Sequence, residues 1–464
     1  MALSTATTWE VRTTGNDLNG GGFVTGASGT DYSQFNSAQF NGTDLAATSA
    51  TGTAPVVTSA SHNFVTADVG NIIHISAGTS WTTGWYQIVS VASNAATLDR
   101  ACGSIASPVS GTWYEGGALA TVKQVIINMT VTGMTAYIKS GTSYSVTSTM
   151  TLSSASNALT FIGYTTTRGD GGQATLTTAT NSVNLITYSS GTSTMVFENI
   201  IFSCTAGTPG NGFTNTNAGY LINLHFFNCK FTGWNLGFSN PSGSSITIFM
   251  YMENCNITSC SYGLSFAGGS TTLILIDTIV QACTNDGIAQ SGSGLSLFAI
   301  RSTFYNNGGK GVNQSVSAAC SFSLFNCNFA SNTSDGLTYG GSSTSLNWLV
   351  VSNTIFYSNG GYGINVNTSV PILDNNLLNC FFYNNSSGKY TTAVTQSVGE
   401  IAGGANPFNN ASGGDFSLNQ AATGGALCRG AGWPGILQAG GTGYEDVGAI
   451  SHGDPKWRVG FRGV

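Results

Sequence analysis

The chain carries a sequence motif that recurs about every 25 residues between positions 225 and 390. Each copy starts with a short apolar run, continues through one polar residue that we call the anchor, and reaches a glycine followed by an apolar residue, as in Gly263-Leu264. A period in this range is typical of solenoids, in which a single repeat cannot bury its own apolar face. The anchors are Asn228, Asn254, Asp277, Arg301, Asn326, Asn353 and Asn379, and their successive spacings are 26, 23, 24, 25, 27 and 26 residues.

The pattern inside each copy indicates strands rather than helices. Residues two before and three after the anchor are apolar, and the residue directly after it is small, as in Phe226, Phe231 and Cys229. This alternation has the period of a strand, and the many Gly, Ser, Thr and Asn residues disfavour helices. We therefore predict an all-β parallel β-helix with three short strands per coil and a rise of about 4.8 Å per coil.

A second set of asparagines follows six residues after the later anchors. Asparagine tolerates the left-handed backbone of a tight corner, and stacked asparagine side chains can hydrogen bond along the stack. We expect such a corner and ladder at Asn307, Asn332, Asn359 and Asn385.

These motifs resemble the right-handed parallel β-helix family, most strongly over 190–390. The phrase Tyr137-Ile-Lys-Ser-Gly-Thr-Ser-Tyr144 also resembles the opening coils of pectate-lyase-like members. The resemblance implies a right-handed solenoid, and enzymes on this fold usually act on polysaccharides.

We expect four parts along the chain. Residues 1–40 form an N-terminal capping segment, and 41–117 form a small β module whose short strands do not follow the repeat. Residues 118–395 form the β-helix, with its first strand candidate at 122–128. The repeat decays in 396–464, which we expect to form a C-terminal cap and tail.

The composition excludes several classes of function. Only 7% of the residues are charged, the net charge is −6 and no basic run occurs, so we expect no nucleic-acid binding. No unbroken apolar stretch is long enough to span a membrane. The first nine residues lack the features of a secretion signal, so we expect the protein to act where it is made or to leave by cell lysis.

Ten cysteines are present, and four of them occupy the position after an anchor: Cys229, Cys255, Cys327 and Cys380. We expect them to point inward as small buried hydrophobic residues, with disulfides between coils as the alternative. The chain has no C-x-x-C motif and only four histidines, so we predict no zinc or other metal site and no cofactor.

The repeat offers no obvious catalytic residues. Glycoside hydrolysis needs two carboxylates roughly 5–10 Å apart, which neighbouring coils would supply from matching positions. Glu253 aligns with apolar residues in both neighbouring copies, and Asp277 aligns with Asn254 and Arg301. The Asp277 and Arg301 pair is a candidate for lyase chemistry, but a structural salt bridge is the simpler interpretation. Arg168-Gly-Asp170 spells an adhesion tripeptide, which we attribute to chance in a glycine-rich turn.

One outward face of the predicted solenoid is strongly apolar. If the position two before the anchor points inward, the positions one, three and five before it point outward. An apolar patch of this size exceeds the few hundred Å² that monomers tolerate. We predict a homotrimer interface, and coverage by a loop or by the tail is the alternative. We call these residues the outer strip: Phe227, Phe249, Tyr251, Ile274, Ile276, Phe298, Ile300, Phe325, Trp348, Val350 and Leu378.

The composition, the N-terminal β module and the outer strip together resemble β-helix proteins of bacteriophage virions. Such proteins are tail fibres, tailspikes, or head-attached fibres or decoration proteins. The resemblance implies a non-enzymatic structural protein of the virion that contacts other virion proteins and binds host surface polysaccharide. The alternatives are a polysaccharide-degrading hydrolase or lyase, and a bacterial surface adhesin, which the missing signal disfavours.

Overall fold

A computed structural model describes residues 3, 5–152, 158–189, 193–216, 221–241, 247–292, 294–314, 320–340, 347–366, 372–392, 394, 397–432 and 445–450. The strands form sheets of 13, 11 and 10 strands, which we call sheets 1, 2 and 3, together with a closed barrel and a two-stranded sheet. The predicted all-β parallel solenoid is confirmed. No helix in the described ranges is long and apolar enough to cross a membrane. The chain divides into a first unit, 1–207 with 220–229, and a second unit, 208–219 with 230–464.

The first unit contains the opening coils. β1 (Thr7–Val11) pairs with β2 (Gly22–Val24) in the antiparallel sense and with β9 (Met134–Lys139) in the parallel sense. The N-terminal segment therefore adds a strand directly to the edge of the solenoid, which removes an open edge. The other coil strands of this unit are β12 (Ala158–Tyr164), β15 (Ser193–Glu198) and β18 (Leu221–Phe227) in sheet 1, β10 (Tyr144–Ser145), β13 (Ala174–Thr178) and β16 (Ile200–Cys204) in sheet 2, and β11 (Met150–Leu152) and β14 (Ile186–Tyr188) in sheet 3.

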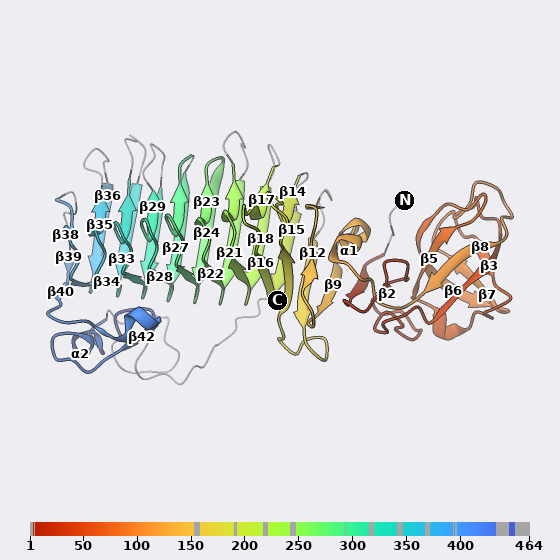
Figure 1. Cartoon of the computed structure of the whole chain (residues 1–464), viewed down its shortest axis with the longest axis horizontal. Helices are drawn as coiled ribbons and strands as arrows, with labels where there is room; N and C mark the ends of the chain where they lie inside the picture. The colour runs from red at the N-terminus through yellow and green to blue at the C-terminus, as the bar shows by residue number, and fades with distance from the viewer. Residues whose placement is uncertain are drawn as a thin grey trace. The chain divides into compact units, whose positions relative to one another are not determined.

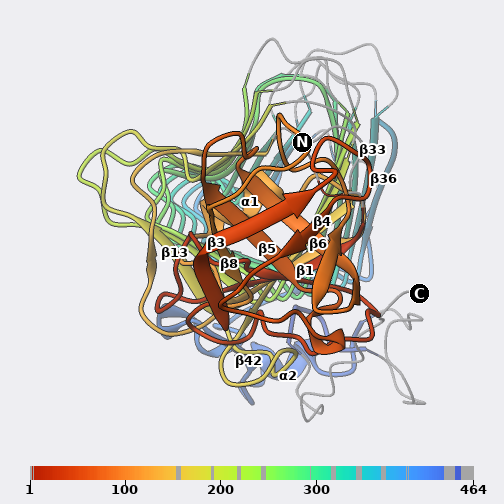
Figure 2. The ribbon, with the colours of Figure 1, turned by 90° about the vertical axis from the view of Figure 1, so that its right-hand side faces the viewer.

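A closed antiparallel barrel interrupts these coils in sequence. Its strands are β3 (Phe40–Thr48), β4 (Val56–Thr58), β5 (Ile72–Ala77), β6 (Gly84–Ala92), β7 (Ala95–Leu98) and β8 (Gly111–Glu115), with the 3₁₀ helix η1 (Thr66–Asp68) between β4 and β5. Figures 1 and 2 show β3, β5, β6 and β8 grouped together. Phe64, Tyr86 and Trp113 are buried in its core. The barrel has an apolar core of its own, as an independent module requires.

The strand expected at 122–128 is wrong, because this segment is the helix α1 (Val122–Asn128). The Thr121 hydroxyl accepts a hydrogen bond from the Gln124 backbone N–H and caps the helix. Val122, Val125 and Ile126 are buried, which is the spacing of one helical face. A short apolar run fits either period, so the sequence alone could not decide.

Each coil of the second unit contributes one strand to each sheet, and Figure 1 shows several of them side by side. Sheet 1 contains β21 (Thr247–Glu253), β24 (Ser270–Ile276), β27 (Leu295–Ile300), β30 (Ser321–Phe325), β33 (Asn347–Ser352), β36 (Ile372–Leu378) and β39 (Ser397–Val398). Sheet 2 contains β19 (Lys230–Thr232), β22 (Asn256–Thr258), β25 (Ile279–Gln281), β28 (Thr303–Tyr305), β31 (Asn328–Ala330), β34 (Ile355–Tyr357), β37 (Phe381–Tyr383) and β40 (Ile401–Ala402). Sheet 3 contains β17 (Asn211–Asn215), β20 (Leu236–Asn240), β23 (Tyr262–Phe266), β26 (Ile288–Gln290), β29 (Val312–Gln314), β32 (Leu337–Tyr339), β35 (Tyr362–Val366) and β38 (Gly388–Tyr390).

Every anchor occupies the corner between a sheet 1 strand and a sheet 2 strand. All seven have a left-handed backbone, with φ from 46° at Arg301 to 54° at Asn254. Asparagine is among the residues that adopt this conformation most readily, which explains its frequency at the anchors. Asp277 and Arg301 adopt the same geometry, so the corner is set by the fold and not only by the residue type.

The predicted asparagine ladder is confirmed. The Nδ2 atoms of Asn307, Asn332 and Asn359 donate to the Oδ1 atom of the next member at 2.9, 2.9 and 2.8 Å, the last acceptor being Asn385. The left-handed residues, however, lie one position earlier, at Asn306, Ser331, Ser358 and Asn384. Asparagine is therefore required in the ladder for its buried amide and not for its backbone.

Each repeat has glycine at or just before the start of its sheet 3 strand because the next coil lies very close to this position. A Cβ atom on Gly311 would lie 2.6 Å from the carbonyl oxygen of Gly336, and one on Gly263 would lie 2.4 Å from that of Gly287. Adjacent coils approach too closely at this position for any side chain.

The interior of the second unit is a stack of apolar residues. Ring centroids of Phe304, Phe329, Phe356 and Phe382 are separated by 4.7, 5.0 and 5.1 Å in turn. All ten cysteines of the chain are buried and carry free thiols, which confirms the inward prediction for Cys229, Cys255, Cys327 and Cys380. The Cys327 thiol donates to the Phe325 carbonyl oxygen at 3.4 Å, and burial raises its pKa to about 12, so it remains protonated.

The C-terminal segment packs on sheet 2 of the second unit. It contains β41 (Phe408–Asn410), η2 (Ala411–Gly413), β42 (Asp415–Leu418) and α2 (Gly425–Cys428), and Figure 1 shows α2 and β42 beside these coils. Phe416 makes an edge-to-face contact with Tyr305, with ring centroids 4.8 Å apart. Within the predicted C-terminal cap and tail, 396–464, residues 433–444 and 451–464 lie outside the described residues.

Candidate functional site

The outer strip lies on the outward face of sheet 1. In the second unit, Tyr251, Ile274 and Phe298 are register partners on β21, β24 and β27. Phe298 is 37% exposed and Trp348 is 47% exposed, whereas Ile300 is buried at 7%. The other described members are half-buried, including Phe227 of the first unit. Ten of the eleven residues therefore reach the surface, and the subunit interface itself stays a prediction.

The described part of the C-terminal segment reaches the corner of the strip but not its exposed members. The Asn326 side chain donates to the Asp446 carbonyl oxygen at 2.9 Å, and the Gly448 N–H donates to the Asn353 carbonyl oxygen at 2.7 Å. These contacts hold 445–450 against the anchors. The described part of the C-terminal segment does not cover Phe298 and Trp348, which remain exposed.

Polar side chains gather beside the strip at the anchor corner. Arg301 donates from Nε and Nη2 to the two carboxylate oxygens of Asp277, both at 2.8 Å. The Tyr251 hydroxyl donates to Glu253 Oε2 at 2.9 Å. These hydrogen bonds from Arg301 to Asp277 raise the pKa of Arg301, although burial opposes this, and the charges of Asp277, Glu253 and Glu445 add to the effect. Both carboxylates therefore accept hydrogen bonds from neighbouring side chains.

We expect the Asp277 and Arg301 pair to be structural and weak. Both side chains are about a third exposed, at 34% and 38%, and exposed pairs contribute about 0–1 kcal/mol. The double variant Asp277→Asn, Arg301→Asn places asparagine in two left-handed corners, and we expect it to change the free energy of unfolding by less than about 1 kcal/mol. Thermal and denaturant unfolding check this, and a loss above about 3 kcal/mol would contradict a weak surface pair.

Two further acidic residues link neighbouring coils. Asp286 accepts the Lys310 N–H and the Asn313 side-chain amide, both at 2.8 Å. Asp335 accepts the Tyr362 N–H at 2.8 Å and is buried. Both carboxylates satisfy donors of the next coil, which is a structural role.

The adhesion tripeptide is engaged within the first unit. Arg168 forms ion pairs with Glu10 at 2.8 Å and Asp31 at 3.0 Å. Asp170 accepts backbone N–H groups of the turn 165–167, and these hydrogen bonds hold its pKa well below the usual range. Both charged groups of the tripeptide are thus bonded within the first unit, while Asp170 itself is exposed, and the chance interpretation stays a prediction.

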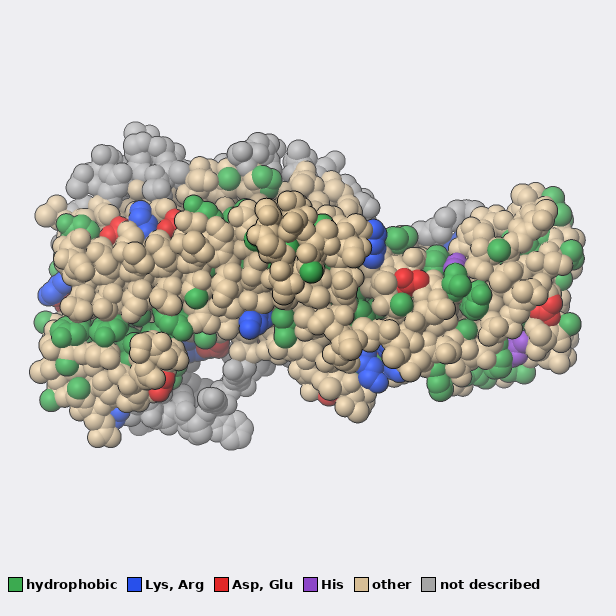
Figure 3. Space-filling model, viewed as in Figure 1, with side chains coloured by type: hydrophobic (Ala, Val, Ile, Leu, Met, Phe, Trp, Pro, Cys, Tyr) green, Lys and Arg blue, Asp and Glu red, His purple; other side chains and the backbone are tan. Residues whose placement is uncertain are grey.

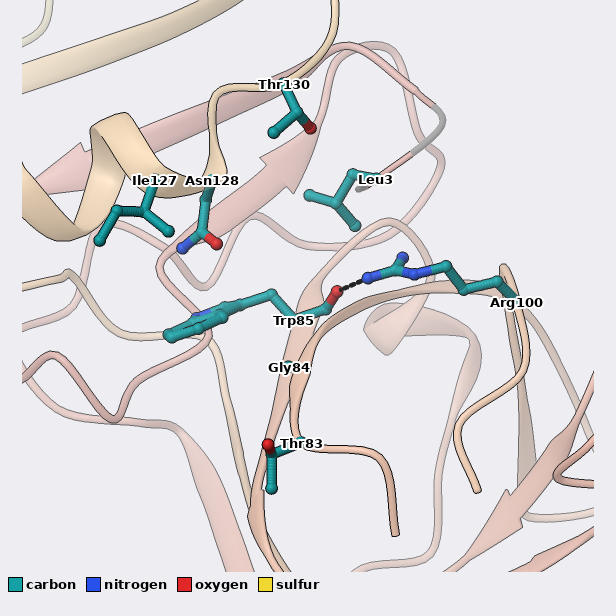
Figure 4. A pocket seen from close by; sticks show the side chains of 8 residues that line it. All are labelled: Leu3, Thr83, Gly84, Trp85, Arg100, Ile127, Asn128 and Thr130. Atoms are coloured by element: carbon teal, nitrogen blue, oxygen red, sulfur yellow. Dashed lines mark hydrogen bonds between the residues drawn. The ribbon is translucent and has the colours of Figure 1, made fainter. Parts of the chain in front are cut away.

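The first unit also holds a cavity of about 310 Å³, which sequence reasoning missed. Figure 4 shows its lining, which includes Trp85, Arg100, Ile127 and Asn128. Trp85 stacks on His74 with centroids 3.8 Å apart. The residues come from separate segments of the chain, so no local motif marks the cavity.

Charged groups are few on the face shown in Figure 3. The repeated coils and their three parallel sheets define the class of the protein, a parallel β-solenoid. Among the described residues, its sheet 1 carries the partly exposed apolar strip.

Comparison with known proteins agrees with this class. Residues 240–412 match the family model described as a right handed beta helix region. No curated protein matches the chain.

Three solved structures are similar to this chain at low sequence identity. Pectate lyase Pel9A is 13% identical, with 72% of this chain and 91% of that chain covered and a TM-score of 0.44. The GH87 alpha-1,3-glucanase catalytic unit from Streptomyces thermodiastaticus is 10% identical, with 86% and 95% covered and a TM-score of 0.27. The tailspike protein gp49 from Pseudomonas phage LKA1 is 12% identical, with 82% and 65% covered and a TM-score of 0.20. At these identities and scores, none of the similarities indicates an activity for this chain.

Proposed function

We propose that the chain is a non-enzymatic structural protein of a bacteriophage virion, such as a tail fibre, a tailspike or a head-attached decoration protein. It assembles as a homotrimer and presents its surface to host glycans. The observation that carries the proposal is the outer strip, in which Phe298 and Trp348 remain more than a third exposed on sheet 1. Exposed apolar side chains gathered on one face often mark a protein interaction site.

The solenoid geometry suits a closed assembly. Strip residues repeat at the coil spacing of about 4.8 Å, so three parallel copies can pack their strips along one axis. The bonding of Glu253 to Tyr251 and of Asp277 to Arg301 supports a non-enzymatic role for the same face. Few charges and stacked, hydrogen-bonded coils favour a stable protein that persists outside a cell.

We expect the purified chain to have a solution mass of three times 47.7 kDa. The double variant Phe298→Asp, Trp348→Asp places charges in the strip and should give a folded protein of one third of that mass, since buried unpaired charges are costly. Light scattering and circular dichroism measure both. Val109→Asp, at a residue 62% exposed in the first unit, is the matched control and should remain trimeric. A wild-type monomer would overturn the trimer.

Two further measurements test the virion role. Mass spectrometry of gradient-purified particles should detect the chain at a stoichiometry divisible by three. Incubation of the trimer with host surface polysaccharide should show binding without new reducing or unsaturated ends. Turnover would instead support the polysaccharide-degrading alternative.

A further inference from the structure

Three ligand-type side chains converge at one end of the barrel in the first unit. His62 follows β4, Asp68 ends η1, and Glu115 ends β8, where it is the register partner of Phe40 and Ile73. One ligand atom from each lies within 4.8 Å of the other two. Asp68 and Glu115 are fully buried, at 0% exposure.

The two carboxylates have more acceptor capacity than donors. Asp68 Oδ2 accepts the Val65 N–H at 2.8 Å and lies 2.9 Å from His62 Nε2. Asp68 Oδ1 and both carboxylate oxygens of Glu115 have no hydrogen-bond donor among the described residues. Buried charges are normally paired or coordinate metal ions. Asp68 has His62 as a partner, whereas the Glu115 carboxylate has none among the described residues.

The three groups lie among aromatic rings rather than among basic residues. The Phe40 ring stacks on His62 with centroids 3.7 Å apart, and Phe64 meets it edge-on at 5.0 Å. Burial raises the pKa of the Tyr32 hydroxyl, and the charges of Asp68 and Glu115 add to this effect. No lysine or arginine in the described ranges forms an ion pair with either carboxylate.

We propose that His62, Asp68 and Glu115 bind one divalent cation, with Zn²⁺ as the best fit. One imidazole and two carboxylates suit zinc and similar first-row ions, and three protein ligands leave a fourth position for water. Zinc bonds of about 2.0–2.2 Å place tetrahedral ligand atoms about 3.4 Å apart, so binding draws the three groups slightly inward. The cation would tie the β4 loop and η1 to β8. This site goes beyond the structural function proposed above.

The competing explanation is that Asp68 and Glu115 share one proton, which would also allow two buried carboxyl groups to lie close together.

The test uses the untagged chain, stripped with chelator and titrated with ZnCl₂ by calorimetry. Bound zinc is counted by elemental mass spectrometry. We expect one zinc per chain and a higher melting temperature with zinc. Glu115→Gln should weaken binding at least about tenfold, whereas Glu400→Gln, in the second unit, should not.

The visible spectrum of the Co²⁺-loaded wild-type chain provides a second check. It should show the d–d bands of a low-symmetry site, and His62→Asn should shift or abolish them. No bound metal in the wild type, or zinc affinity unchanged in both Glu115→Gln and His62→Asn, would overturn the site and leave the shared proton. Because the trimer is measured separately by mass, failure of one proposal does not affect the other.

Discussion

Replacement of Phe329 by alanine is expected to lower the free energy of unfolding of the second unit by about 3–5 kcal/mol. Phe329 is fully buried and stacks between Phe304 and Phe356 at 4.7 and 5.0 Å. The substitution removes both ring contacts and leaves a cavity. The flanking coils cannot close on it, because hydrogen-bonded strands fix their spacing.

Denaturant and calorimetric unfolding measure this loss. Phe35→Ala removes the same atoms from a side chain that is 49% exposed, and we expect a change below about 0.5 kcal/mol. Since each coil contacts mainly its neighbours, the loss should also appear as faster hydrogen exchange in β28, β31 and β34. A loss below about 1 kcal/mol for Phe329→Ala would show that the stack is loosely packed.

Replacement of Asn332 by alanine is expected to cost about 2–5 kcal/mol, since each buried polar group left unpaired costs about 1–3 kcal/mol. Asn332 Oδ1 accepts from the side chain and the backbone N–H of Asn307, at 2.9 and 3.3 Å. Its Nδ2 donates to Asn359 Oδ1 at 2.9 Å and to the Phe304 carbonyl oxygen at 3.1 Å. Alanine leaves all of these partners buried inside the ladder.

The matched control for the ladder is Asn409→Ala. Asn409 is exposed and donates to the Ser417 hydroxyl at 2.7 Å. When this hydrogen bond is removed, water can bond to the Ser417 hydroxyl in its place. We expect a change below about 1 kcal/mol there. Both losses in the free energy of unfolding are measured by the same methods. Equal losses for Asn332→Ala and Asn409→Ala would mean that the buried ladder stabilises the fold no more than an exposed hydrogen bond does.

The features that sequence reasoning recovered are those in which one residue type answers one local requirement. A left-handed corner favours asparagine, as at Asn254, and contact with the carbonyl oxygen of Gly336 permits only glycine at Gly311. These requirements recur in every coil, so the same residue types recur in the sequence. That periodic pattern predicts the stacked strands. The outward direction of the strip follows from the same alternation.

The tertiary structure alone decided the features that join distant segments. The run at 122–128 fits a helix or a strand, and only capping by Thr121 and burial of one face select the helix. Asp277 and Arg301 take the left-handed corner because the coils on either side impose it. His62, Asp68 and Glu115 are separated in sequence, so no spacing rule links them. Barrel closure brings the three together, since strand pairing sets which loops meet at its end.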